Sequence, residues 1–381
     1  MTSANNIYSL ALTGVQQLVP YKPGKPIEEL QRELGLSKIV KLASNENPLG
    51  PGKKALAAIQ LVLSELALYP DGSGFDLKQA LAKKYSLDAG QITLGNGSNE
   101  ILELVARAFL RPGLDVIFSQ HAFAVYPLVT QAVGASAVVV PAVNYGHDLA
   151  GMLASVTKNT RVIFIANPNN PTGTLLSQAD VEAFIAALPD TVVCVLDEAY
   201  FEFVSRTEPV DSISWLKKYP NLIITRTFSK AYGLAGLRAG YSLSSPEIAD
   251  ILNRVRQPFN NNTLALVAAE AALGDEEHLN QTISVNAQGM QQLTAGFKTL
   301  GLEWIPSAGN FVSVDLRQPG QPIYEALLRK GVIVRPVGNY ELPNHLRISI
   351  GTQAENEFFL QALADVLELA AANIETTAGA V

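Results

Sequence analysis

Two segments of the chain decide its fold class: TVVCVLDEAY (residues 191–200) and NLIITRTFSK (residues 221–230). Each is an apolar run without in/out alternation that ends in polar residues, which is typical of a strand covered on both faces. Similar runs lie between about Gln91 and Ser244 and alternate with helical periodicity: ITLGNGS, DVIFSQ, SAVVVPAV, TRVIFIANP and AGYSLSS. The sequence therefore predicts an α/β fold with a large domain whose mainly parallel central sheet is flanked by helices.

The C-terminal part of the chain shows a second, smaller set of apolar runs. These are GNFVSVDL, GVIVRPV and HLRISIGT, with a helical PIYEALLRK between the first two. We predict an N-terminal arm over residues 1–36, a large cofactor-binding domain over 37–262 and a smaller α/β domain over 263–381. The Pro- and Gly-rich segment 20–26 and the loop 42–52 are expected to lie over other parts of the molecule.

Composition excludes several functional classes. The 381 residues are 48% hydrophobic and 17% charged, with a formal net charge of −7, and no Lys/Arg cluster suits a nucleic-acid partner. The single cysteine, Cys194, excludes an intramolecular disulfide, and the four histidines lack zinc-ligand spacing, so no metal site is predicted. The N-terminus does not resemble a signal peptide and no apolar run is long enough to span a membrane, which predicts a cytoplasmic protein.

Polar side chains stand at the ends of the predicted strands, where ligands gather in parallel sheets. One ligand accounts for them together: pyridoxal 5'-phosphate needs an amine, an acid for its ring nitrogen, donors for its phenolate oxygen and an anion site. Lys230 is the candidate amine, and Asp197 is the candidate acid that keeps the ring nitrogen protonated. Tyr200 and Asn170 are candidate donors to the ring oxygen.

The phosphate of such a cofactor needs backbone N–H groups and positive charge. GNGSNEILELVARAF, from Gly95, is read as a strand-to-helix turn whose free N–H groups bind an anion. Hydroxyls and a guanidinium follow in the RTFSKAYGLAGLRAG segment. The predicted phosphate contacts are Gly97, Ser98, Asn99, Thr227, Ser229 and Arg238.

Other side chains are candidates for the ring and the substrate. HAFAVYPL offers Phe123, with Tyr126 nearby, for stacking on the cofactor ring, although either aromatic alone is more often a core residue. Arg335 and Arg347 lie on apolar strands, where an unpaired guanidinium is costly, so they are expected to face an anionic substrate. An ion pair with a nearby carboxylate is the alternative, about equally favoured for Arg335.

Two rival ligand sites are alternatives to this interpretation. A strand ending in Asp-Glu also suits an ATPase, but GPGKKAL at residues 50–56 lacks the glycine spacing and the hydroxyl of a P-loop. A dinucleotide site is disfavoured because Glu100 replaces the third glycine and Gln120 ends the next strand without an acid. Taken singly, Lys230 could be an exposed lysine in a turn and Asp197 a cap.

The motifs NPNNPTG, DEAY, TFSKAYGLAGLRAG and LRISIGT, in this order and spacing, resemble the fold-type I aminotransferases from end to end. The earlier segments YKPGKPIEELQRELG, KLASNENPLGP and LYPDGSG are similar to those of the histidinol-phosphate aminotransferase branch. This resemblance implies that Lys230 forms the Schiff base with the cofactor and that Asp197 pairs with the pyridinium. It also implies that Tyr69 reaches the cofactor phosphate of a neighbouring subunit, and therefore a homodimer with shared active sites.

The resemblance further implies which residues bind substrate: Tyr21, Asn47, Arg335 and Arg347. Phe123 departs from the family, where the stacking position is often tyrosine. The implied activity is amino-group exchange between L-histidinol phosphate and 2-oxoglutarate/glutamate in histidine biosynthesis. An aromatic amino acid aminotransferase, a threonine-phosphate decarboxylase and a catalytically idle cofactor-binding regulator are the alternatives.

Overall fold

The computed structural model describes residues 7–20, 23–204 and 211–378, and its centre is a seven-stranded sheet of order β2-β8-β7-β6-β5-β3-β4. The strands are β2 (Ile92–Asn96), β3 (Asp115–Ser119), β4 (Ser136–Val140), β5 (Thr160–Ala166), β6 (Val193–Asp197), β7 (Leu222–Thr227) and β8 (Ala239–Ser244). Within this sheet β8 runs antiparallel to both of its neighbours, and the other pairs are parallel. The predicted α/β fold with a mainly parallel sheet is confirmed.

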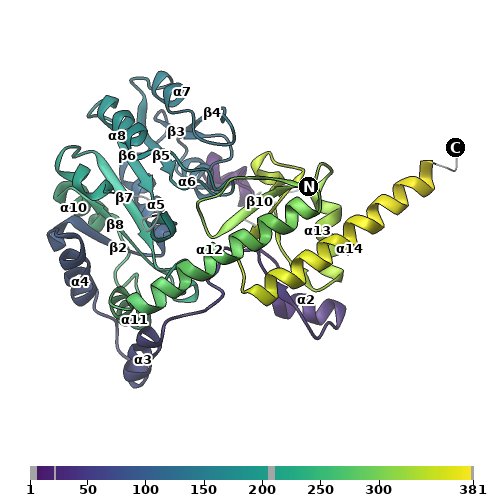
Figure 1. The fold of residues 1–381 in the computed structure, drawn as a ribbon. Helices are drawn as coiled ribbons and strands as arrows, with labels where there is room; N and C mark the ends of the chain where they lie inside the picture. Colours follow the sequence, from purple (N-terminus) through teal and green to yellow (C-terminus); the bar gives the residue numbers. More distant parts are fainter. Residues whose placement is uncertain (1–6, 21–22, 205–210, 379–381) are drawn as a thin grey trace, which may run out of the picture.

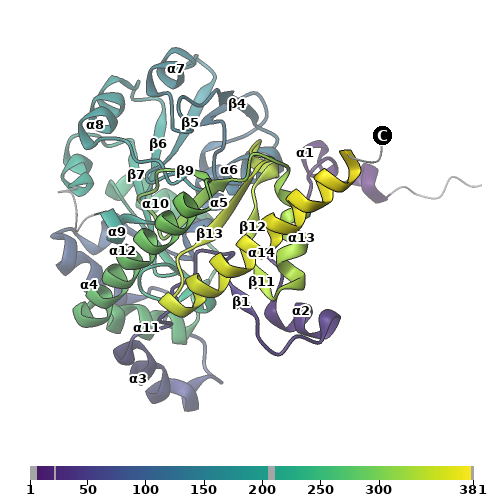
Figure 2. The same cartoon turned by 45° about the vertical axis from the view of Figure 1, so that its right-hand side comes forward.

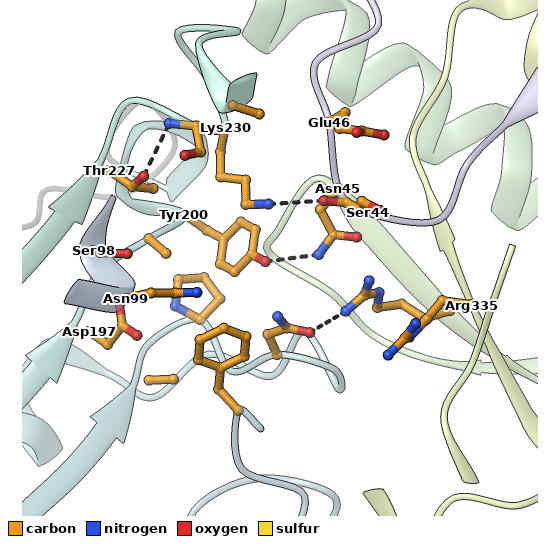
Figure 3. Close-up of a pocket in the computed structure, with 18 of the residues that line it drawn as sticks. Ser44, Asn45, Glu46, Ser98, Asn99, Asp197, Tyr200, Thr227, Lys230 and Arg335 are labelled. Carbon is orange, nitrogen blue, oxygen red and sulfur yellow. Dashed lines mark hydrogen bonds between the residues drawn. The ribbon is translucent and has the colours of Figure 1, made fainter. Parts of the chain in front are cut away.

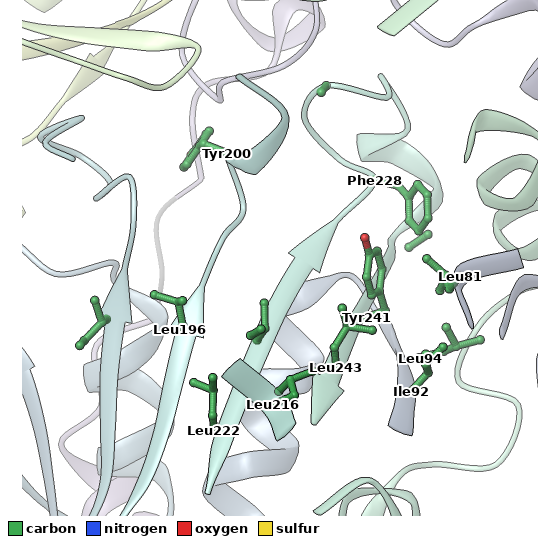
Figure 4. Packing of buried hydrophobic residues seen from close by; sticks show 14 of the residues in the cluster. Leu81, Ile92, Leu94, Leu196, Tyr200, Leu216, Leu222, Phe228, Tyr241 and Leu243 are labelled. Carbon is green, nitrogen blue, oxygen red and sulfur yellow. The ribbon is translucent and has the colours of Figure 1, made fainter. Parts of the chain in front are cut away.

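Each central strand of this sheet serves two hydrophobic cores. On β6, Leu196 belongs to the core on one face and Val195 to the core on the other, and Ile224 and Ile223 divide in the same way on β7. Figure 4 shows how side chains of the first core, such as Leu196, gather along one side of neighbouring strands. Because both faces are covered, the strands have no polar face, which explains the missing alternation in the sequence.

Helices cover both faces of the large sheet (Figure 1). Helices α5 and α10 contribute to one core, with Tyr126 of α6, while α4, α7, α8 and α11 contribute to the other. Their bounds are α4 (Phe75–Tyr85), α5 (Ser98–Phe109), α6 (Val125–Ala132), α7 (Leu149–Ala154), α8 (Gln178–Ala187), α10 (Pro246–Val255) and α11 (Thr263–Leu273). Strands β2 and β7 are both antiparallel to β8, so they run in the same direction. Because α5 follows β2, the turn that begins α5 lies at the edge of the sheet where the parallel strands end.

A second, four-stranded antiparallel sheet of order β12-β13-β10-β9 has its own core. It comprises β9 (Glu303–Ile305), β10 (Phe311–Asp315), β12 (Arg335–Pro336) and β13 (His345–Ser349), with helices α12 (Glu276–Thr299), α13 (Gly320–Arg329) and α14 (Gln353–Ala378). Figures 1 and 2 show α12 running from α11 to this sheet, where it lies beside α14. The strands expected here are present, β9 was not anticipated, and the domain limits at residues 36 and 262 stay a prediction.

The N-terminal part of the chain joins the two sheets. Strand β1 (Val40–Lys41) pairs in parallel with β11 (Val332–Ile333), and the loop 42–52 then crosses toward the large sheet. The remaining elements are η1 (Ile7–Leu10), α1 (Thr13–Gln16), α2 (Ile27–Leu34), α3 (Lys53–Val62), η2 (Leu63–Glu65), η3 (Ala89–Gln91), α9 (Phe201–Val204), η4 (Ser212–Lys217), η5 (Ala235–Leu237) and η6 (Gly338–Tyr340). Among the helices that the structure describes, none combines the length and apolar character needed to cross a bilayer.

Glu202 on α9 is a buried carboxyl group. It is 5% exposed, and burial raises its pKa to about 7 against the opposing influence of the Arg226 guanidinium. The folded protein thus keeps this proton up to about pH 7, whereas the unfolded chain releases it near the ordinary value of 4.5. Folding stability must therefore fall as pH rises through this window.

Glu202→Gln should remove this pH-dependent loss, because glutamine does not titrate. From pH 5 to pH 8 we expect the free energy of unfolding of the variant to improve relative to wild type by up to roughly 3 kcal/mol. Urea unfolding at the two pH values measures this, with the exposed Glu357→Gln as the control. A difference between variant and wild type that stays constant with pH would contradict the assignment.

Candidate active site

A cavity of about 260 Å³ lies at the carboxyl ends of β5, β6 and β7, closed by the loop 42–52 and by residues of β12 and β13 (Figure 3). Most of the residues that the sequence assigned to the site line this cavity. They are Ser98, Asn99, Phe123, Asn170, Asp197, Tyr200, Thr227, Ser229, Lys230, Arg238, Arg335 and Arg347. Segments that are far apart in the sequence are thus brought together around one space.

Lys230 enters the cavity from the loop after β7. Its Nζ donates a hydrogen bond to the backbone oxygen of Ser44 at 3.0 Å. Removal from water lowers the pKa of Lys230 to about 7, helped by the charges of Arg347 and Arg238 and opposed by Glu46. A large fraction of this amine is therefore neutral near pH 7, as a nucleophile toward an aldehyde must be.

Asp197 ends β6 on the other side of the cavity. Its carboxylate accepts hydrogen bonds from the hydroxyls of Tyr126 at 2.9 Å and of Thr225 at 3.0 Å. Burial raises the pKa of Asp197, and these two hydrogen bonds oppose the rise. A cationic group placed in the cavity would favour the ionised carboxylate, which is the relation expected for a pyridinium partner.

The two aromatic candidates have different places. Phe123 lines the cavity, as expected for a ring that stacks on a ligand. Tyr126 is fully buried, stacks on Phe164 with 4.6 Å between centroids, and donates its hydroxyl to Asp197. The suggestion that Tyr126 could stack on the cofactor is therefore wrong, because its ring packs in the core and its hydroxyl orients the acid.

Tyr200 and Asn170 face the cavity with their polar groups held in place. The Tyr200 hydroxyl accepts a hydrogen bond from Nδ2 of Asn45 at 2.8 Å, and burial raises its pKa to about 12. Asn170 accepts a hydrogen bond at Oδ1 from Arg347 at 2.6 Å, which leaves its amide N–H groups as donors. The peptide bonds Asn167–Pro168 and Asn170–Pro171 are both cis.

An anion cradle forms at the first turn of α5. Ser98 and Asn99 begin this helix, where backbone N–H groups have no acceptor within the helix. Gly97 has a φ of 77°, and a Cβ there would lie 2.3 Å from Nη2 of Arg238, so glycine permits the guanidinium to approach. Arg238 also donates to the hydroxyl of Ser229 at 3.2 Å. Backbone donors, hydroxyls and a guanidinium together suit a phosphate.

Two arginines line the opposite wall of the cavity. Arg335 on β12 and Arg347 on β13 are register partners across an antiparallel pair. Like charges directly opposite each other destabilise a sheet, and an anion bound between them removes that cost. Arg347 is positioned by its bonds to Asn170 and to the backbone oxygen of Ala43 at 2.7 Å. This wall is suited to a carboxylate or phosphate group.

Two residues assigned from the resemblance, Tyr69 and Asn47, do not line the cavity in this single chain. Tyr69 is 82% exposed and stacks on Phe259. Asn47 donates from Nδ2 to the backbone oxygen of Ala231 and to the hydroxyl of Thr282, so it fixes the loop 42–52 against the segment that carries the lysine. Tyr21 lies outside the described residues.

The structure also adds residues to the site that the sequence did not single out. Ser44, Asn45 and Glu46 line the cavity from the loop 42–52, and Tyr340 lines it from η6. A usable signal existed for Asn45: it is an asparagine in a Gly- and Pro-rich loop, and this residue type tolerates a left-handed backbone better than most. The structure gives it a φ of 54°. Nothing in the local sequence distinguishes Tyr340 from an ordinary core tyrosine.

Comparison with known proteins agrees with this arrangement. Residues 37–363 match the family model described as aminotransferase class I and II. Histidinol-phosphate aminotransferase 2 of Pseudomonas fluorescens Pf0-1 is 61% identical over 96% of this chain and 99% of its own length. Histidinol-phosphate aminotransferase 1 of Nitrosococcus oceani is 56% identical over 95% of this chain and 98% of its own.

Solved structures give the same result. The histidinol-phosphate aminotransferase of Sinorhizobium meliloti, crystallised in complex with pyridoxal-5'-phosphate, superposes with a TM-score of 0.87 at 33% identity, covering 94% of this chain and 97% of that one. L-threonine-O-3-phosphate decarboxylase of Porphyromonas gingivalis, at 24% identity and a TM-score of 0.77 over 87% of this chain and all of its own, shares the fold. The resemblance seen in the sequence is confirmed, and the chain belongs to the class I and II aminotransferase family, within the branch of the histidinol-phosphate aminotransferases.

Proposed function

We propose that this protein is a pyridoxal-phosphate-dependent transaminase that exchanges an amino group between L-histidinol phosphate and 2-oxoglutarate/glutamate in histidine biosynthesis. The observation that carries the proposal is that Lys230, Asp197 and the anion cradle of α5 meet in one cavity, opposite the paired arginines Arg335 and Arg347. The names of relatives that are more than half identical over nearly the full chain support the same substrate.

The residues present fit the proposed cofactor. When bound, the cofactor supplies an aldehyde that takes up the amine and a protonated ring that receives the electron pair left at the substrate Cα. Lys230 would hold the aldehyde carbon, Asp197 the ring nitrogen, and Tyr200 and Asn170 the ring oxygen. Once the substrate amine has taken its place on the cofactor, Nζ of Lys230 would remove the proton from the substrate Cα. It would then deliver that proton to the cofactor carbon that carried the aldehyde.

The paired arginines explain how one site can accept two different substrates. A phosphate and a carboxylate both present oxygens that a guanidinium can bind through two parallel hydrogen bonds. Arg335 and Arg347 could therefore hold histidinol phosphate in one half-reaction and glutamate in the other. A threonine-phosphate decarboxylase or an aromatic aminotransferase would share the cofactor residues, so the substrate must be tested directly.

Single-turnover absorbance separates these functions. The purified holoenzyme is mixed in turn with L-histidinol phosphate, L-glutamate, L-phenylalanine and L-threonine phosphate, and the visible band of the lysine-bound cofactor is followed. Rapid bleaching by histidinol phosphate and by glutamate is expected. Bleaching by phenylalanine but not by histidinol phosphate would make the protein an aromatic aminotransferase, and colour without any bleaching would indicate an idle cofactor-binding protein.

A cytoplasmic location stays a prediction from the sequence. The proposal also includes a homodimer whose two subunits share their active sites. Large apolar side chains stand exposed around the end of α3 and the following segment: Leu61 at 80%, Leu68 at 70% and Tyr69 at 82%. Such a cluster is typical of a protein–protein contact. A second copy of the chain covering it would bring Tyr69 to the neighbouring cavity, as the family resemblance implies.

Mixing two inactive variants tests whether Tyr69 serves the neighbouring site. Tyr69→Ala and Lys230→Ala subunits each lack one component, but a mixed dimer contains one site with both components intact. After random subunit exchange, activity should recover to about a quarter of the wild-type value, because half of the dimers are mixed and each has one complete site. Recovery no greater than the sum of the separate variants would show that Tyr69 acts within its own subunit or not at all.

A further inference from the structure

A buried ion pair lies on the far side of β6 and β7 from the cavity. Arg226 is 1% exposed, and its Nε and Nη2 donate to the same oxygen of Glu198 at 2.9 and 2.7 Å. The guanidinium carbon is 3.3 Å from the centroid of the Phe201 ring, and the Tyr85 ring stands at 5.0 Å. The guanidinium is therefore held by two hydrogen bonds and packed between aromatic rings.

The pair is adjacent in sequence to the groups proposed to hold the cofactor. Glu198 directly follows Asp197, and Arg226 directly follows Thr225, whose hydroxyl donates to Asp197. Asp197 and Thr225 are register partners, and the Glu198 backbone N–H donates to the Thr225 oxygen at 2.9 Å. The ends of the two strands are thus linked by side chains on both faces, and the segment leading to Lys230 begins directly after Arg226.

Stability alone is a weak reason for this arrangement. Removing two charges from water is costly, and replacing a buried ion pair by uncharged residues of similar size is often neutral or stabilising. The pair also has an electrostatic effect at the site: burial raises the pKa of Asp197, the charge of Glu198 adds a smaller rise, and Arg226 lies against Glu198. Neutralising Glu198 therefore favours an ionised acid on the cavity side.

Resting on the proposed function, we propose that Arg226 and Glu198 are positioning residues for the cofactor. They fix the ends of β6 and β7 so that Asp197 and Lys230 meet the same ring from two directions. Arg226 also offsets the negative charge of Glu198 and so lessens its effect on Asp197.

Other titratable groups face this pair and enter the design of the test. Glu202 on α9 and Tyr85 on α4 act on Arg226 electrostatically, as does Tyr241 on β8, which shares a hydrogen bond of 2.7 Å with Tyr85. Asp197 faces Tyr126 and Thr225 on its own side. The pKa of Glu202 is raised to about 7 by burial, so loss of Glu198 leaves a second carboxyl group able to compensate in part for its charge.

Three variants of the holoenzyme separate the mechanical contribution from the electrostatic one. Glu198→Gln leaves the positive charge and should lower the apparent pKa of the visible cofactor band. Arg226→Met leaves the negative charge and should raise that pKa, each by at least about half a pH unit. Glu198→Gln combined with Arg226→Met removes both charges, so its band should titrate close to the wild-type pKa.

Cofactor affinity is the second readout. Arg226→Met and the double variant lose the side-chain hydrogen bonds between the strand ends, so their dissociation constant for pyridoxal phosphate should rise by about tenfold or more. In Glu198→Gln the amide oxygen can still accept from Arg226, so the rise should be smaller. The matched control is Glu182→Gln with Lys218→Met, which removes a solvent-exposed ion pair of 2.7 Å between Nζ and Oε1. This control should leave both the band pKa and the affinity unchanged.

The outcomes distinguish this inference from the proposed function. Shifts of the same sign in the two single variants, or wild-type affinity in the double variant, would overturn it. If a variant fails to fold, Arg226→Lys keeps the charge but not the planar fork, and it should weaken affinity with little change in the band pKa. If the wild-type protein bound no cofactor, the proposed function itself would be refuted. The pKa of the band and the cofactor affinity are measured without substrate, so they test this inference independently of the substrate assignment.

Discussion

Lys230→Ala is expected to slow amino transfer by roughly 10⁴-fold or more, because one side chain provides both the attachment for the cofactor and the base for the Cα proton. The structure supports both tasks, since this amine lies in the cavity and its pKa is lowered to about 7. Release of the ketone product from L-histidinol phosphate in a single turnover measures the effect on chemistry, because a variant without Lys230 has no lysine-bound band to bleach. Appreciable turnover by the variant would show that another group performs the proton transfer.

A second lysine provides a matched control for this prediction. Burial lowers the pKa of Lys78 on α4 too, with Arg256 nearby, but Lys78 does not line the cavity. Lys78→Ala should keep nearly the wild-type rate, so an unspecific effect of losing a partly desolvated lysine would be recognised.

The pH dependence of cofactor binding provides a further test of Lys230. In the wild-type apo protein, the rate of cofactor capture should rise as pH increases through about 7 and then level off, because the neutral amine of Lys230 is the nucleophile.

The large sheet was predictable because its strands have a clear physical signature. Residues such as Val195 and Leu196 must both be apolar when each faces a different core, so the runs stand out in the sequence. Strand β9 has no such signature: it has three residues, and Glu303 is exposed. Strands β1 and β11 have two residues each, so their pairing follows from the tertiary arrangement and not from a local pattern.

The candidate site was predictable to the extent that it is built from strand ends. In a parallel sheet these ends lie at one edge, so the sequence alone could place Asp197 and Lys230 in the same site, without knowledge of the distance between them. Asn45 and Tyr126 were harder, because their contacts depend on how a loop and a helix approach the sheet. The place of Tyr69 beside a neighbouring site was inferred from the family resemblance alone and stays a prediction, because in this single chain its side chain is exposed.

Asp197→Asn should lower the single-turnover rate by about 10²- to 10³-fold, through loss of the charge that stabilises a protonated ring. Asparagine has nearly the same shape, and its side-chain oxygen can still accept one of the hydrogen bonds now donated by Tyr126 and Thr225, so the cavity should be preserved. The readouts are the rate of bleaching by L-histidinol phosphate and the absorbance of the bound cofactor.

Asp115→Asn is the matched control for the loss of a carboxylate. Asp115 begins β3, and this end of the strand is remote from the cavity. The control should leave both readouts unchanged. If the rate of Asp197→Asn stayed within about threefold of the wild-type rate, the assignment would be contradicted.

The reason to expect a large effect of Asp197→Asn lies in the burial of Asp197. Its side-chain hydrogen-bond donors, Tyr126 and Thr225, are both neutral, and burial of a carboxylate with neutral donors raises its pKa. A cation on the cavity side reverses this cost, and the protonated ring is the cation that the proposed chemistry requires.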